Sequence, residues 1–256
     1  MIILSMQICK SEKKIMVKNI LIKSQNHNIT LLTNGVENPK KIVLSLHGFN
    51  GDAWGNGFSK LRKRFDDILV CSFDCAGHGE SEVDAIDMSV ELIDNEIKSV
   101  LDYLQKTYPN VKIVILASSY GGYRTICALN HKKISGVSQF VFLNPAFKML
   151  KIMEIIREFD YNTLPEGSKL LMKNGTEKYV SKRFLDEIHE NDLYAQKYEN
   201  PIPLTMFLGK RDSLVPTQDS IEFSKIYPCQ IVYLDEEHSF EYPESWDMVA
   251  TFLKNC

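Results

Sequence analysis

Short apolar runs alternate with longer amphipathic stretches along most of this sequence. Most runs are apolar at successive positions rather than alternate ones, which is typical of parallel strands covered on both faces. Six runs predict such strands: residues 41–48, 68–74, 112–118, 140–144, 204–209 and 230–236. Two earlier runs, 16–23 and 27–33, alternate more and predict an antiparallel hairpin at one edge of the sheet.

The stretches between the runs predict helices. In residues 87–107, apolar side chains recur at helical spacing, and residues 120–131, 217–227 and 244–254 follow the same kind of pattern. Strands that alternate with helices form right-handed βαβ units. We therefore expect an α/β fold with a doubly wound, mostly parallel sheet of about eight strands.

One segment interrupts this alternation. Between Pro145 and Pro201 there is no clear strand, and the helix-like pieces there make the segment too long for a plain connection. We expect residues 146–200 to form a small helical cap on a core of residues 1–145 and 201–256. Residues 1–15 read as an extension that precedes the first regular strand pattern.

Composition and charge narrow the function classes. The chain has 256 residues, 44% hydrophobic and 25% charged, with a formal net charge of −3 and both signs scattered. This pattern is typical of a globular protein and gives no basic stripe for nucleic acid. No run approaches the roughly 18 apolar residues of a membrane span, and the lysines near the N-terminus follow the apolar run, unlike those of a signal peptide.

The six cysteines fit no zinc-binding spacing, so no metal site or cofactor is expected. They are typical of free thiols in a reducing compartment, although spacing alone leaves a disulfide open. We therefore expect a cytoplasmic protein. The sequence leaves open whether the chain forms a homodimer.

The stretch "ILASSYGGY", residues 115–123, carries the main chemical signal. A buried strand ends in two serines and a helix pattern follows, as in a nucleophile elbow. That tight turn needs small residues two positions before and two after the nucleophile. Ser119 is flanked by Ala117 and Gly121, whereas Ser118 is flanked by two large residues. Ser119 is the candidate nucleophile, with a serine-rich turn as the alternative.

A serine nucleophile needs a base and an acid that orients the base. In this architecture the chain order is serine, acid, histidine. Asp212 follows the strand at 204–209, and His238 follows the next strand. Asp235 lies within or at the very end of its strand, and Glu236 and Glu237 adjoin the histidine too closely to reach its ring easily. Asp212 is therefore the predicted acid.

The reaction also needs N–H donors for an oxyanion. The stretch "SLHGFNGD", residues 45–52, follows an early strand, and its Phe49 is the predicted first backbone donor. Tyr120, the residue after the candidate nucleophile, is the predicted second. His47 and Gly48 would shape the turn. Taken alone, "HGF" could equally be an ordinary turn at a strand end.

Five motifs in order resemble the α/β-hydrolase superfamily over nearly the whole chain: "LHGFNGD", "DCAGHGES", "ASSYGG", "GKRDSLVP" and "EEHSF". The chain is most similar to short-cap serine esterases, monoacylglycerol lipases and serine-aminopeptidase-like members. In such proteins the loop "DCAGHGES" is mainly structural, which implies that Asp74 and His78 are loop anchors. Serine at the elbow differs from the aspartate of haloalkane dehalogenases and epoxide hydrolases.

The expected activity is a serine carboxylesterase that acts on a small-molecule ester with a small or medium acyl or aromatic group. A thioesterase, or an amidase or peptidase, would use the same triad. A ligand-binding module that kept the fold without turnover is the third alternative. Apolar cap residues could form an acyl pocket or pack the cap onto the core: Phe147, Met149, Met153 and Ile156.

Overall fold

The computed structural model describes residues 17–173, 177–199 and 201–256. The predicted extension at residues 1–15 lies outside them. Eight strands form one sheet in the order β1-β2-β4-β3-β5-β6-β9-β10. Their bounds are β1 Lys18–Ser24, β2 His27–Thr33, β3 Lys41–Leu46, β4 Ile68–Phe73, β5 Lys112–Ser118, β6 Val137–Leu143, β9 Leu204–Gly209 and β10 Cys229–Leu234.

The sheet is mostly parallel, as predicted. All neighbouring pairs from β4 to β10 are parallel. β1 and β2 form an antiparallel hairpin that joins the sheet through an antiparallel pairing of β2 with β4. The alternating strands of the sequence at 16–23 and 27–33 therefore occupy one edge, where the pattern placed them.

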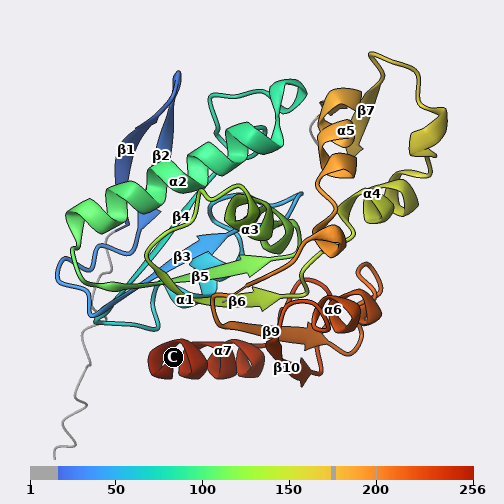
Figure 1. Cartoon of the computed structure of the whole chain (residues 1–256). Coiled ribbons are helices and arrows are strands. Elements are labelled where there is room, and N and C mark those ends of the chain that lie inside the picture. Colours follow the sequence, from blue (N-terminus) through green and yellow to red (C-terminus); the bar gives the residue numbers. More distant parts are fainter. Residues whose placement is uncertain (1–16, 174–176, 200) are drawn as a thin grey trace, which may run out of the picture.

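Helices cover both faces of this sheet, as Figure 1 shows. Along β3, Ile42 and Leu44 belong to one buried cluster, whereas Val43 belongs to the cluster on the opposite face. Burial on both sides explains why the strands are apolar at successive positions. The helices of the core are α1 Asn56–Leu61, α2 Val90–Thr107, α3 Tyr120–Asn130, α6 Thr217–Phe223 and α7 Pro243–Asn255, with a 3-10 turn η1 at Ala85–Asp87.

The segment between β6 and β9 lies beside the carboxyl ends of the central strands (Figure 1). Its helical elements are α4 Met149–Arg157, η2 Tyr161–Thr163, α5 Lys182–Glu190 and η3 Leu193–Ala195. It also contains a two-stranded antiparallel sheet that the sequence pattern did not predict, formed by β7 Lys169–Lys173 and β8 Glu177–Ser181.

No helix in the described ranges is both long and apolar enough to cross a membrane.

Candidate active site

Ser119 lies at the apex of the turn between β5 and α3. Its backbone has φ 51° and ψ −118°, a conformation that costs a non-glycine residue about 1–3 kcal/mol. Three backbone hydrogen bonds hold it, one of which the Gly122 N–H donates to the Ser119 oxygen at 2.9 Å. The Ser119 N–H donates to the Leu143 oxygen at 2.9 Å, and the Ser119 oxygen accepts from the Ala146 N–H at 3.0 Å. The strand-to-helix turn predicted from the sequence is therefore present, with Ser119 at its strained position.

The turn leaves no space for a side chain at Gly121. A Cβ there would lie 2.5 Å from the Leu46 oxygen and 2.9 Å from the His47 oxygen. Ala117, two residues before Ser119, is fully buried. Ser118 is the last residue of β5 and pairs with Leu143 in the ladder. The size argument that separated the two serines thus matches the local geometry.

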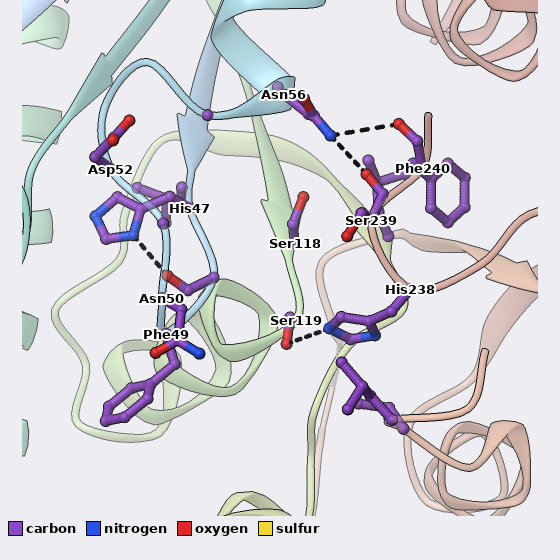
Figure 2. A pocket seen from close by; sticks show the side chains of 18 of the residues that line it. His47, Phe49, Asn50, Asp52, Asn56, Ser118, Ser119, His238, Ser239 and Phe240 are labelled. Atoms are coloured by element: carbon purple, nitrogen blue, oxygen red, sulfur yellow. Dashed lines mark hydrogen bonds between the residues drawn. The ribbon is translucent and has the colours of Figure 1, made fainter. Parts of the chain in front are cut away.

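His238 reaches Ser119 from the loop after β10. Its Nε2 lies 3.0 Å from the Ser119 Oγ, and its Nδ1 lies 2.8 Å from Asp212 Oδ2. A carboxylate only accepts hydrogen bonds, so Nδ1 carries the proton and Nε2 is left to accept from the serine hydroxyl. Figure 2 shows the His238 ring aimed at Ser119. The structure therefore brings together all three residues that the sequence singled out.

Asp212 is fixed from its other side. Its Oδ1 accepts from the N–H groups of Leu214 and Val215, both at 2.9 Å. Only 1% of its side chain is exposed, against 19% for His238. These two hydrogen bonds and the one from His238 compensate the buried carboxylate for its lost contacts with water. The acid is thus buried and rigid, while the base faces the cavity.

Asn144 joins the loops that carry these groups, and sequence reasoning missed it. Its Nδ2 donates to the oxygens of Glu237 and His238 at 2.9 and 3.2 Å, and its Oδ1 accepts from the Gly209 N–H at 2.7 Å. It lies just after β6 and has a positive φ of 43°. A non-glycine residue at positive φ is held there by such contacts.

Glu236 shapes the histidine loop instead of orienting its ring. Its carboxylate accepts from the N–H groups of Glu241 and Tyr242 at 3.1 and 2.9 Å. From outside the loop, Asn56 Nδ2 donates to the Ser239 oxygen at 2.6 Å (Figure 2). The loop that carries His238 is thus fixed from within and from α1.

The turn after β3 packs directly against Ser119. A Cβ at Gly48 would lie 3.3 Å from the Ser119 Cβ. His47 holds this turn, because its Nδ1 donates to the Gly48 oxygen at 2.8 Å and its Nε2 accepts from the Cys75 N–H at 3.2 Å. Within the described residues, the N–H groups of Phe49 and Tyr120 donate to no acceptor.

Asp74 and His78 are loop anchors, as the resemblance implied. Asp74 accepts from the N–H groups of Ala53 at 2.6 Å and Glu80 at 3.0 Å. His78 Nε2 donates to the Phe49 oxygen at 2.5 Å. Both side chains therefore hold the turn that carries Phe49, rather than facing Ser119.

A cavity of about 430 Å³ opens beside Ser119 and His238. Met149, Met153 and Ile156 of α4 line it, as one of the two interpretations of the cap expected. Phe147 does not line it. That ring is buried and stacks on Phe223 at 3.9 Å between centroids, which is the packing role of the other interpretation.

Two histidines outside the site pair with buried carboxylates. His27 pairs with Glu96 at 2.8 Å, and His131 pairs with Asp94 at 2.5 Å. Burial raises the pKa of Cys75 to about 12, so it stays a thiol at neutral pH. Among the described residues, no three His, Cys, Asp or Glu side chains gather closely enough to hold a metal ion.

Comparisons with known proteins point to one family. The family model described as "Serine aminopeptidase, S33" matches residues 37–196. A solved structure of Est1E from Butyrivibrio proteoclasticus with bound ferulic acid is 20% identical, with a TM-score of 0.75 over 92% of this chain and 98% of that one. No curated protein sequence matches the chain.

Two further solved structures have the same fold. A hydrolase described as putative, from Agrobacterium vitis S4, is 18% identical, with a TM-score of 0.73 over 93% of this chain and 97% of that one. The esterase Pf2001 from Pyrococcus furiosus is 21% identical, with a TM-score of 0.67 over 94% and 92% of the two chains.

Proposed function

Because the chain belongs to the serine aminopeptidase family of α/β-hydrolases, and is therefore a hydrolase, we propose that it cleaves carboxylic esters through an acyl-enzyme on Ser119. The observation that carries the proposal is the pair of distances at His238. One ring nitrogen lies 3.0 Å from the serine oxygen and the other 2.8 Å from a buried carboxylate. This is the hydrogen-bonded series that activates a serine hydroxyl.

In the first half-reaction, Ser119 Oγ attacks the ester carbonyl while His238 Nε2 takes the hydroxyl proton. Asp212 holds the imidazole in the required tautomer and stabilises its positive charge. The backbone N–H groups of Phe49 and Tyr120 stabilise the oxyanion. The bond between carbonyl carbon and alkoxy oxygen then breaks, and the alcohol leaves with the proton from His238.

In the second half-reaction, water replaces the alcohol. His238 takes a proton from the water, whose oxygen attacks the carbonyl of the acyl-enzyme. The same two N–H groups stabilise the second oxyanion. The ester bond to Ser119 breaks, the serine regains its proton from His238, and the acid product leaves.

We propose further that residues 146–200 act as a cap on a core formed by residues 1–145 and 201–256. Two observations support this division. The segment leaves the sheet after β6 and rejoins it at β9. Within it, α4 supplies an apolar wall of the cavity beside Ser119.

A second candidate is hydrolysis of an amide or peptide bond, which the aminopeptidase description of the matched family favours. The same three side chains would serve, because His238 can protonate an amine as readily as an alcohol. Matched ester, thioester and aminoacyl substrates separate these reactions by their kcat/KM values. The apolar wall of the cavity favours an ester with a hydrocarbon acyl group.

The test compares hydrolysis of p-nitrophenyl esters from acetate to decanoate by the wild type, Ser119→Ala and Ser118→Ala. We expect Ser119→Ala to lose about 10⁴-fold or more in kcat, and Ser118→Ala to keep most of its activity. A fluorophosphonate probe should label the wild type and Ser118→Ala alone. Equal rates for the wild type and Ser119→Ala would refute the proposed nucleophile.

A further inference from the structure

Arg157 is the one lysine or arginine among the described residues that line the cavity beside Ser119. It lies in the last turn of α4 and is half-buried. Within the described ranges, its guanidinium makes no ion pair or hydrogen bond. A cation that lines a cavity without a protein anion beside it can pair with an anion supplied by a ligand.

Arg157 lies at the end of α4 away from the segment that contacts Ser119. The segment leading into α4 starts at the elbow, where the Ala146 N–H donates to the Ser119 oxygen at 3.0 Å. The helix begins three residues later, at Met149. Arg157 is eight residues after Met149, which corresponds to a rise of about 12 Å along the helix axis. Arg157 therefore marks the end of the α4 wall that is remote from Ser119.

The wall between these two ends is apolar. The residues of α4 that line the cavity are Met149, Ile152, Met153, Ile156 and Arg157. Their spacing of three and four residues puts them on one side of the helix. A hydrocarbon chain that starts at Ser119 would thus lie along thioether and aliphatic groups before it reaches the guanidinium.

The acidic side chains of the cavity lie on a different wall. Asp52 and Glu241 line it from loops of the core, not from the cap. Glu241 accepts from Asn56 at 3.2 Å and lies 3.8 Å from the Lys60 ammonium. Glu154, on α4 itself, is outside the lining and accepts from the Tyr161 N–H. An anion in the cavity is therefore repelled from the core loops and attracted to Arg157.

We infer that the acyl group of the substrate carries an anionic group, in its simplest form a carboxylate, at the end remote from the ester. The substrate class is the half-ester of a medium-length dicarboxylic acid. This inference rests on the proposed esterase function. Apolar contact with α4 would hold the chain, and the guanidinium would pair with the terminal carboxylate.

The test uses p-nitrophenyl half-esters of adipic and suberic acid, each beside the same molecule with its free carboxyl capped as a methyl ester. We expect the kcat/KM of the wild type to be about tenfold higher for the free suberate half-ester than for its methyl-capped form. A factor of this size corresponds to the free energy of one well-placed charge-assisted contact. Added salt should reduce this preference only modestly, because salt screens a half-buried ion pair less than an exposed one. Equal kcat/KM values for the free and capped suberates in the wild type would overturn the inference.

Variants test whether Arg157 causes the preference for the free carboxylate. Arg157→Gln should lower kcat/KM for the free suberate about tenfold and change the capped ester by less than about twofold, because only the charge contact is lost. Arg157→Lys should retain part of the preference. Lys151→Gln removes a charge from the same helix at an exposed position outside the lining, and should keep the full preference. A preference that survives in Arg157→Gln would also overturn the inference.

The capped esters separate the two proposals. If the wild type hydrolyses them through Ser119 but shows no preference for the free carboxylate, the acyl inference fails and the esterase proposal stands. If neither form is hydrolysed in a Ser119-dependent way, the esterase proposal itself fails.

Discussion

The guanidinium of Arg124 lies beneath the turn that carries Phe49, with its Nη2 at 3.4 Å from the His47 oxygen. Only 2% of Arg124 is exposed. Its guanidinium carbon lies 5.9 Å from the ring centroids of both Phe73 and Tyr120. Two of its nitrogens, Nε and Nη1, have no hydrogen-bond partner among the described residues. A buried cation thus supports the backbone from which an oxyanion donor is expected.

Replacing Arg124 should therefore lower the catalytic activity without lowering the stability of the fold. We expect Arg124→Met to lower kcat about tenfold with little change in KM, because the Phe49 turn loses its support. Its free energy of unfolding should stay equal or rise, since an incompletely paired buried charge is removed. Steady-state kinetics and urea unfolding measure the two effects. A variant that lost stability and kept kcat would contradict this role.

Asp212→Asn should lower kcat by about 10³–10⁴-fold near neutral pH, because an amide does not hold the imidazole tautomer or stabilise its charge. Asp235→Asn is the matched control, since Asp235 has an exposed side chain and was rejected as the acid. That variant should stay within about twofold of the wild type. Kinetics with p-nitrophenyl butyrate measure both, and similar losses would exclude Asp212 as the specific partner of His238.

Gly121→Ala should disrupt the elbow, because the new Cβ would meet backbone oxygens that cannot move aside. We expect a loss of about 1–3 kcal/mol in the free energy of unfolding and a large loss of activity. Gly167→Ala provides the contrast. Its Cβ meets nothing within 4 Å, although its φ of +74° is unfavourable for alanine. That variant should lose about 1–2 kcal/mol and keep its activity.

Asp94 should give the fold a measurable pH dependence. Burial raises the pKa of this carboxyl from 3.8 to about 6, against the opposing effect of His131. The folded chain thus binds the proton more tightly than the unfolded chain does. The resulting stability is fully present below about pH 4 and is lost as the pH rises through about 6.

Asp94→Asn cannot lose a proton and should lack this dependence. The stability of the wild type relative to Asp94→Asn should therefore fall by about 2–3 kcal/mol between about pH 4 and pH 7. Urea unfolding of both proteins across this range measures the difference. A constant difference would show that the folded carboxyl has an ordinary pKa.

Much of the fold could be predicted because its signals are local. Doubly buried strands give continuous apolar runs, and the elbow requires small residues at fixed offsets from Ser119. The β7–β8 pair was missed because its strands have five residues each and carry lysines within a charged stretch. Asn144 and Arg124 were missed for a different reason. Their contacts join loops that are far apart in the sequence, so no local pattern marks them.

The position of β10 has a consequence for how the active site loses its geometry in denaturant. Among the described strands, β10 is at the end of the sheet and pairs with β9 alone, while β5, which precedes Ser119, has a paired strand on each side. His238 follows β10 by four residues. Marginal strands open locally at a lower free energy than central ones, and amide exchange detects such openings. Fraying of β10 would carry His238 away from an elbow that stays folded. Mild denaturant should therefore abolish turnover before the whole sheet unfolds. Catalytic activity then measures the local stability of the edge strand β10 rather than that of the core.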